Sequence, residues 1–379
     1  MKPLSLRRPL TCDVLIFDVI GVNWLRECIP DNVAIGHLDV RNCIPIFFSP
    51  LFFFILLKTF FIEITKTTPR LTQIYLFTLF DYIDPKILLT AADNNGIVAR
   101  YANSRPHLLT VFVQNALRDT AGTLEQGLNL PIYFSLGEVE ADIFRRINVS
   151  CSSYMPIGSV KLGIALRDYN GSKNEYVDLC FISHFRPLML QDSPLTLDLS
   201  IEKINRLLFL LTCQYAISNK LSLAVLSKNR DPSSLKIELD YFESLASGQP
   251  ISFVKGDKGA REFLTYHAAL SSQLIVHPAS TLGFELFSVG QKVLFGASAV
   301  EGLVCEWGID EYFRHLPDIV VLNSAAETEF FSKADYLLNM TTENYRNTTH
   351  DAAKRCIAMP DREYPHDVIR RWLGTHLAR

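Results

Sequence analysis

Residues 273–285 read QLIVHPASTLGFE, and this stretch decides the fold. An apolar strand at Gln273–Val276 ends in His-Pro, two hydroxyl residues follow, and a helix then carries a carboxylate on its first turns. A helix capped by Ser or Thr directly after a strand has backbone N–H groups pointing out of its N-terminus, where a phosphate can bind. We therefore expect a phosphate site here, with the carboxylate placed to hold ribose hydroxyls. Its residues are His277, Pro278, Ser280, Thr281 and Glu285.

A structural interpretation of the same stretch is the alternative. Ser280 or Thr281 can be an ordinary N-cap, with His277 as a loop residue. The position after a buried strand and before Glu285 favours the ligand-binding interpretation.

Similar strand and helix patterns lie on both sides of this stretch. In the second half we predict strands at 176–182, 221–226, 251–254, 292–295 and 318–322, and helices at 199–217, 233–246, 260–270 and 281–289. In the first half we predict strands at 13–19, 85–90, 108–113, 132–136 and 154–157, and helices at 51–64, 70–82 and 140–147.

The polar stretch 167–175 separates the two halves and is typical of a linker. Two consecutive halves of this kind predict an α/β fold with two Rossmann-like domains facing across a cleft. We expect an N-terminal domain at 1–170 and a C-terminal, nucleotide-binding domain at 176–360. Residues 361–379 are expected to form a final helix, for which packing back on the first domain is one option.

Polar residues follow several of the predicted strands, at the sheet edge where open α/β sheets bind ligands. In the first half these are Asp93, Asn94, Asn95, Gln114, Asn115, Arg118, Asp119, Glu138, Gly158, Ser159 and Lys161; in the second they are Ser183, His184 and Arg186.

These polar residues suggest distinct roles. Amides suit sugar hydroxyls, so Asn94, Asn95, Gln114 and Asn115 are candidates for binding a substrate, as is the guanidinium of Arg118. Asp93, Asp119 and Glu138 are candidate catalytic carboxylates, and the strand ends at Gly158–Lys161 and Ser183–Arg186 are candidates for the nucleotide. Turns, helix caps and acids at helix N-termini are the structural alternatives.

Composition excludes some functions. The 379 residues carry a net charge of −3, which leaves no electrostatic footprint for nucleic acid. The eight cysteines form no Cys-x-x-Cys pair, which argues against zinc and favours reduced thiols in a cytoplasmic protein. No long apolar core precedes Asp13, so we do not expect a signal peptide.

A phenylalanine-rich stretch at residues 44–62 is the one candidate for membrane contact. Pro45, Pro50 and Lys58 interrupt it, whereas a membrane span needs about 20 apolar residues in a row. We predict a buried helix over 51–64, and peripheral contact with a membrane surface stays open as the alternative.

The order of these motifs resembles that of bacterial surface-carbohydrate biosynthesis proteins from O-antigen and capsule clusters. The resemblance rests on residues Pro85–Asn95, Val111–Asp119, Tyr133–Glu138, Pro156–Lys161, Phe181–Arg186 and His277–Phe295, which cover most of residues 80–300. A wider likeness is to GT-B glycosyltransferases that use CMP-activated acidic sugars and carry a His-Pro motif followed by Ser or Thr. It implies that His277, Pro278, Ser280 and Thr281 hold the cytidylate phosphate. Family members usually have Gly where this chain has Ala116.

The resemblance implies a metal-independent glycosyltransferase that needs no cofactor besides its nucleotide-sugar donor. It would move a Kdo- or nonulosonate-like sugar from CMP to a polysaccharide or lipopolysaccharide acceptor at the inner face of the cytoplasmic membrane. His277 would stabilise charge on the leaving phosphate. The catalytic carboxylate stays open among Asp93, Asp119 and Glu138, and so does the choice of inverting or retaining chemistry. The alternatives are a UDP-sugar 2-epimerase-like enzyme and a non-catalytic paralogue that scaffolds polysaccharide assembly.

Overall fold

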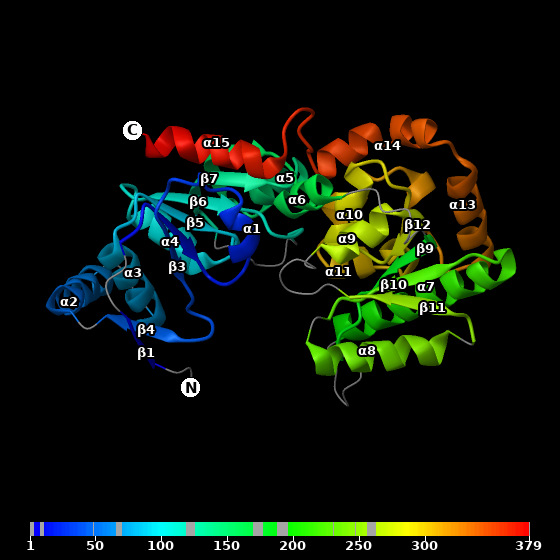
Figure 1. Ribbon diagram of the computed structural model, residues 1–379, viewed down its shortest axis with the longest axis horizontal. Helices are drawn as coiled ribbons and strands as arrows, with labels where there is room; N and C mark the ends of the chain where they lie inside the picture. Colours follow the sequence, from blue (N-terminus) through cyan, green and yellow to red (C-terminus); the bar gives the residue numbers. More distant parts are fainter. Residues whose placement is uncertain are drawn as a thin grey trace.

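Two parallel β-sheets, each flanked by helices, form two lobes in the computed structural model of this chain (Figure 1). The structure describes residues 4–7, 11–47, 49–65, 70–118, 126–169, 177–187, 196–229, 231–246, 248–255 and 263–378. The predicted α/β fold of two Rossmann-like domains is confirmed.

The N-lobe sheet has the strand order β3-β2-β5-β6-β7-β8, and every pairing is parallel. Its strands are β2 (Val14–Phe17), β3 (Ile35–Leu38), β5 (Ile87–Thr90), β6 (Leu109–Val113), β7 (Asn129–Ser135) and β8 (Ser150–Pro156). A separate parallel pair consists of β1 (Leu4–Arg7) and β4 (Ile44–Phe47). The N-lobe helices are α1 (Val22–Arg26), α2 (Pro50–Ile64), α3 (Leu71–Ile83), α4 (Gly96–Ser104), α5 (Val139–Arg146) and α6 (Val160–Asp168).

Alternation along the N-lobe strands builds two cores, one on each face of the sheet. Leu15 and Phe17 of β2 point to the face covered by α3, α4 and α5. Val14 and Ile16 point to the opposite face, covered by α1, α6 and the C-terminal helix α15 (Pro365–Leu377). The end of the chain therefore completes the core of the lobe in which the chain begins.

The C-lobe sheet has the order β11-β10-β9-β12-β13, again all parallel. Its strands are β9 (Val177–Ile182), β10 (Leu223–Leu226), β11 (Ile251–Val254), β12 (Ser272–His277) and β13 (Val293–Phe295). Its helices are α7 (Thr196–Asn219), α8 (Pro232–Leu245), α9 (Leu264–Leu270), α10 (Thr281–Ser288), α11 (Leu303–Glu306), α12 (Asp310–Phe313), α13 (Glu327–Asn339) and α14 (Thr342–Cys356).

The chain crosses back to the N-lobe after α14, and two glycines admit this crossing. A Cβ atom on Gly137 would lie 2.3 Å from the carbonyl oxygen of Cys356. A Cβ atom on Gly158, whose φ is +85°, would lie 2.5 Å from the carbonyl oxygen of Ala358. The amide of Ala358 donates to the Leu136 carbonyl at 2.7 Å, so the crossing segment is bonded directly to the N-lobe.

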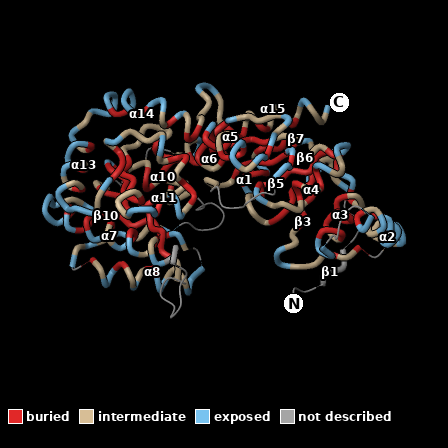
Figure 2. Tube along the Cα trace, turned by 180° about the vertical axis from the view of Figure 1, so that it is seen from behind, coloured by how far each residue is buried: buried red, intermediate tan, exposed pale blue. Residues whose placement is uncertain are grey.

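Two predicted elements differ from the structure. Residues 318–322 were expected as a strand, but Asp318–Val320 is a 3-10 helix, and only Val321 makes a single bridge to Phe295. The helix over 51–64 forms, as α2, but it is not buried, since its side chains at Phe54 and Phe61 are 65% and 64% exposed (Figure 2).

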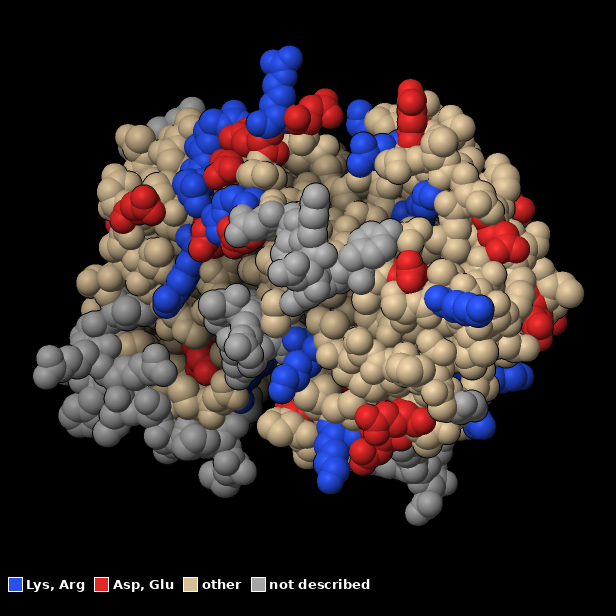
Figure 3. Space-filling model, turned by 45° about the vertical axis from the view of Figure 1, so that its right-hand side comes forward, with Lys and Arg blue, Asp and Glu red and all other residues tan. Residues whose placement is uncertain are grey.

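No helix within the described ranges is long and apolar enough to cross a membrane. On the face shown in Figure 3, basic and acidic side chains are interspersed rather than gathered into a field of one sign.

Candidate functional site

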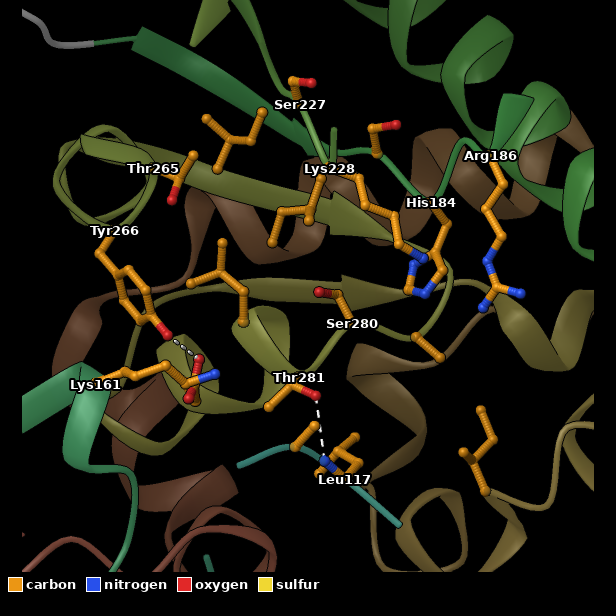
Figure 4. A pocket seen from close by; sticks show the side chains of 18 of the residues that line it. Leu117, Lys161, His184, Arg186, Ser227, Lys228, Thr265, Tyr266, Ser280 and Thr281 are labelled. Carbon is orange, nitrogen blue, oxygen red and sulfur yellow. Dashed lines mark hydrogen bonds between the residues drawn. The ribbon is translucent and has the colours of Figure 1, made fainter. Parts of the chain in front are cut away.

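A pocket of about 490 Å³ lies between the lobes, at the carboxyl ends of β9, β10 and β12 (Figure 4). From β9 the chain continues to β10 and β11 on one side of the sheet and to β12 and β13 on the other. The pocket therefore lies at the topological switch point, where open α/β sheets bind ligands. This interlobe pocket is lined by Ala116, Leu117, Lys161, Ile182, Ser183, His184, Arg186, Leu226, Ser227, Lys228, Thr265, Tyr266, Ala279, Ser280, Thr281, Leu282, Glu285, Trp307 and Ile309.

His277 shapes the turn before α10 but does not line the pocket. Its ring is fully buried, its Nδ1 accepts the amide hydrogen of Ser280 at 2.8 Å, and its Nε2 has no partner. Burial lowers the pKa of His277 to about 3, so the imidazole is neutral. His277 and Pro278, which were expected to contact the phosphate, are not among the residues that line the pocket. The His277 ring instead holds the turn through the Ser280 amide.

The N-terminus of α10 opens into the pocket through Ser280, Thr281 and Leu282. Ser280 is the N-cap residue with extended backbone, and its side chain makes no cap hydrogen bond, so it does not satisfy the free amides of the first turn. Thr281 Oγ1 accepts the amide hydrogen of Leu117, from the N-lobe, at 3.2 Å. Both hydroxyl residues lie where the sequence predicted a phosphate site.

Glu285 links the two lobes. Its fully buried carboxylate accepts from the hydroxyl of Ser159, in the N-lobe, at 2.5 Å and from the hydroxyl of Tyr266 at 2.7 Å. Ser159 also caps α6 by accepting from the amide of Leu162. Glu285 lines the pocket as predicted, but both of its oxygens are engaged by protein rather than free for ribose.

A second buried carboxylate, Glu238 on α8, organises the strand ends on the other side of the pocket. It is fully buried and accepts from the hydroxyls of Ser183 and Ser227, from the amides of Lys228 and Asn229, and from Asn229 Nδ2. Glu238 was not among the residues predicted from the sequence. An acid on a helix that follows a strand is common on solvated helices, so its sequence position did not indicate a buried role.

His184 lines the pocket and carries a buried ring nitrogen that has no hydrogen-bond partner. Its amide donates to Asn205 Oδ1 at 2.9 Å, its ring meets Trp307 edge-on, and its Nδ1 is buried without a partner. Burial, with smaller contributions from nearby Lys228 and His277, holds the pKa of His184 well below its usual range. A neutral imidazole with an open nitrogen can exchange a hydrogen bond with a ligand.

Among the described residues, three cationic side chains line the pocket from both lobes. Lys161 comes from α6, and Arg186 and Lys228 follow β9 and β10 (Figure 4). Lys161 Nζ also donates to the carbonyl oxygen of Asn115 at 2.9 Å, which positions it. Together with the N-terminus of α10, these cations make the pocket suitable for an anionic ligand.

The N-lobe residues that were predicted to form a site make hydrogen bonds and ion pairs with other protein groups. Asp93 is buried, forms a two-point ion pair with Arg118 and accepts from the hydroxyl of Tyr133 at 2.8 Å. Asn95 caps α4 by accepting from the amides of Ile97 and Val98. Asn95 therefore has the capping role that was the structural alternative, whereas the ion pair between Asp93 and Arg118 was not predicted. None of these residues lines the pocket.

Gln114 belongs to a buried cluster that the sequence did not reveal. Its Nε2 donates to Glu140 Oε2 at 2.7 Å, and its Oε1 accepts from the amide of Leu136. The hydroxyl of Tyr312, in the C-lobe, donates to the same Glu140 oxygen at 2.6 Å. Burial is the main cause that raises the pKa of Glu140 to about 8.

Other predicted residues lie away from the pocket. Glu138 and Asn94 are exposed, and the amide of Glu138 donates to the Arg355 carbonyl. Gly158 admits the crossing segment rather than a phosphate. Asp119 lies outside the described residues. Ala116, which lines the pocket, does not have a positive φ, so its methyl group causes no backbone strain.

Asp142, Glu311 and His315 bring their ligand atoms within 4.8 Å of one another at the lobe contact. Each of them faces arginine: Asp142 pairs with Arg355 at 2.6 Å, and Arg355 Nε donates to His315. Arg146 and Arg314 pair with Glu311. Because guanidinium groups already neutralise the carboxylates, this cluster serves as an ion-pair contact between the lobes.

Comparison with protein-family models gave no match, and no curated protein matched in sequence. Solved structures do match. The UDP-GlcNAc 2-epimerase of Methanocaldococcus jannaschii, in complex with UDP-GlcNAc and UDP, aligns with a TM-score of 0.53 and 12% identity over 98% of this chain and 100% of that one. A variant of the wall teichoic acid polymerase TagF aligns with a TM-score of 0.51 and 9% identity over 98% and 90%.

At these identities the likeness concerns the fold. Both alignments cover nearly the whole of this chain and therefore both lobes. The predicted GT-B-like arrangement is thus confirmed for the chain as a whole.

Proposed function

We propose that this chain is a glycosyltransferase that binds a nucleotide-activated sugar in the interlobe pocket and transfers the sugar to a surface-polysaccharide or lipopolysaccharide acceptor. The observation that carries the proposal is the pocket itself. It lies at the switch point of the C-lobe sheet, receives the N-terminus of α10, and is completed by Leu117 and Lys161 of the opposite lobe. Its volume of about 490 Å³ is in the range of small-molecule sites.

The pocket chemistry suits a leaving nucleotide. Cleavage of the bond between sugar and phosphate leaves negative charge on the phosphate. Amides at the N-terminus of α10 and the side chains of Arg186 and Lys228 are donors that can stabilise that charge. His277 would act indirectly, by holding the turn through the Ser280 amide.

The proposed donor is a CMP-activated acidic sugar of the Kdo or nonulosonate kind. Such a donor carries one phosphate and one sugar carboxylate, which are two separate anionic groups. The pocket offers cations from two sides, Lys161 from the N-lobe and Arg186 with Lys228 from the C-lobe. The resemblance to CMP-sugar transferases at His277–Thr281 supports the same donor.

One observation favours transfer over epimerisation, the chemistry named for the Methanocaldococcus neighbour. Moving a proton on and off a sugar carbon needs acidic and basic side chains that face the sugar. Among the described pocket residues the one carboxylate is Glu285, whose oxygens already accept from Ser159 and Tyr266. The imidazole of His184 also lines the pocket, but its pKa lies well below the usual range, which makes it a weak base. In a transfer reaction the acceptor supplies the nucleophile, and Asp119 stays the sequence-based candidate for its base.

Binding and turnover together test the proposal. Titration calorimetry should show tighter binding of CMP than of UDP, and incubation with a CMP-sugar and a glycan acceptor should release CMP. Lys228→Gln should weaken CMP binding about tenfold, as the loss of one charge-assisted hydrogen bond would. Lys354→Gln, at an exposed lysine of α14, is the matched control.

Each other result counts against the proposal. Preference for UDP with interconversion of UDP-sugar epimers would assign the chain to the epimerases. CMP binding without any turnover would indicate a non-catalytic paralogue. If Lys228→Gln binds CMP as tightly as the unmodified chain, the nucleotide does not bind in this pocket.

A further inference from the structure

Helix α2 presents most of its large apolar residues to solvent and buries the polar residues Thr59 and Glu63. Phe52, Thr59 and Glu63 are the buried side chains of this helix, and two of the three are polar. The exposed side chains are mostly large and apolar. They are Leu51, Phe53, Phe54, Leu57, Phe61 and Ile64, and we call them the α2 apolar face.

Polar contacts on the inner side fix this orientation. Glu63 accepts from Gln73 Nε2, on α3, at 3.3 Å and lies 3.7 Å from the guanidinium of Arg105. Phe52 packs against Phe47 and Tyr82. Rotating α2 to hide its phenylalanines would expose Phe52 and break the Glu63 contacts, so the outward apolar face is built into the fold.

The breadth of the face indicates a flat partner. At about 100° per residue, positions 53, 54, 57, 61 and 64 spread over an arc of about 100°, wider than the two-position seam of a helix pair. Leu71, at the start of α3, extends the exposed apolar surface and is 79% exposed. A broad apolar surface of this kind suits an interface plane better than a single partner helix.

The exposed charges on α2 and at the start of α3 have one sign. Among described residues 50–65 and 70–80, Lys58 and Arg70 are exposed and Glu63 is buried. Cations beside an exposed apolar helix attract anionic headgroups, and a lysine can keep its ammonium in water while its stem lies along the apolar surface. The face therefore complements an acidic surface with an apolar interior.

The helix lies at the tip of the N-lobe, at the end of the molecule away from the C-lobe (Figures 1 and 2). A partner bound to α2 would leave the interlobe pocket uncovered. We propose that α2 lies in the plane of an anionic lipid bilayer, with its apolar face in the headgroup and acyl boundary and with Lys58 and Arg70 among the headgroups. This proposal does not depend on the function of the pocket.

Vesicle co-sedimentation of the full chain tests the proposal. The protein should sediment with phosphatidylglycerol vesicles and much less with phosphatidylcholine vesicles, and added salt should weaken the binding. Phe54→Gln combined with Phe61→Gln should weaken binding about tenfold or more, since two side chains that would insert are lost. Both positions are mostly exposed, and Gln is a good helix former, so the variant should fold.

Ile217→Gln together with Ile237→Gln is the matched control, because both side chains are exposed apolar residues on C-lobe helices. It should bind vesicles like the unmodified chain. Three results would overturn the proposal: no sedimentation with either lipid, unchanged sedimentation of the double phenylalanine variant, or a dimer in light scattering that the same variant dissociates. The last would assign the α2 apolar face to a second copy of this chain.

Discussion

His277 is buried among Phe284, Phe295 and the backbone of Gly283, and burial lowers its pKa to about 3. Because Nδ1 accepts the Ser280 amide, the neutral ring carries its proton on Nε2. The ring therefore fills buried space and offers one hydrogen-bond acceptor. Its charge state affects the stability of the protein rather than the charge of the pocket.

A pH dependence follows from this burial. In the unfolded chain His277 binds a proton below about pH 6.5, while in the folded protein it stays neutral down to about pH 3. Its contribution to stability is thus present above pH 6.5 and is lost as the pH falls. From about pH 7.5 to about pH 5 the free energy of unfolding should fall by about 2 kcal/mol on account of this residue.

Asn at position 277 keeps an acceptor for the Ser280 amide but does not titrate. Urea unfolding of His277→Asn should therefore show a smaller loss of stability over the same pH range than the unmodified chain. His184 also has a lowered pKa, but its main cause is burial, which both proteins share. Parallel pH profiles would mean that the pKa of His277 is the same in the folded protein and in the unfolded chain.

At the scale of the element, the start of α10 depends on a glycine. A Cβ atom on Gly283 would lie 1.9 Å from His277 Nε2, whereas a Cβ atom on Gly96, at the start of α4, would meet nothing within 4 Å. Gly283→Ala should destabilise the protein by about 2 kcal/mol and weaken CMP binding, because the ring and the turn must shift. Gly96→Ala should be neutral or slightly stabilising.

Thermal unfolding measures the stability of the two variants, and titration calorimetry measures their affinity for CMP. The contrast depends on the packing of Gly283, since both substitutions place alanine in the first turn of a helix. Equal effects of the two substitutions would show that His277 and α10 have room to separate.

The sequence predicted most of the repeating strands and helices because their signal is local. Apolar runs such as Leu274–Val276 and Ile87–Leu89 are buried on both faces of a parallel sheet, and their pattern needs no partner to be recognised. Short edge elements were missed, among them β1, β3 and β4, because their sequences LSLR, IGHL and IPIF are interrupted by polar residues, Gly or Pro and form no continuous apolar run. The α2 helix was placed correctly, but its burial was not, because composition does not reveal which face turns inward.

The site was only partly predictable, for the same reason. Ser183, His184, Arg186, Ser280 and Thr281 line the pocket as expected, since each follows a strand of the C-lobe. The N-lobe residues Asp93 and Arg118 also follow strands, yet they pair with each other. Contacts such as that between Ser159 and Glu285 join positions far apart in the chain, and local pattern does not carry them.

At the scale of the whole molecule, the lobes are joined by buried polar contacts as well as by the crossing chain. Tyr312 donates to Glu140 away from the pocket lining, and Ser159 donates to Glu285, which lines the pocket. Arg146 adds a partly exposed ion pair to Asp310. A buried contact of this kind is costly when one partner becomes charged without compensation.

Glu140 makes that cost measurable. Burial raises its pKa to about 8, so in the folded protein it binds a proton at neutral pH, whereas in the unfolded chain it releases one above about pH 4.5. Its contribution to stability is present below pH 4.5 and is lost as the pH rises through 8. Between about pH 5 and about pH 7 the free energy of unfolding should fall by about 2 kcal/mol from this group.

Glu140→Gln removes the titration and keeps an oxygen that can accept from Gln114 and Tyr312. Its unfolding free energy should match that of the unmodified chain near pH 5 and exceed it by about 2 kcal/mol near pH 7, as urea titrations at the two pH values would show. Tyr312→Phe is a useful companion, since it removes the contact between the lobes but leaves the buried carboxyl group. A Gln variant that is less stable at both pH values would mean that Glu140 is ionised in the folded protein and that the charge of Arg118 stabilises the carboxylate.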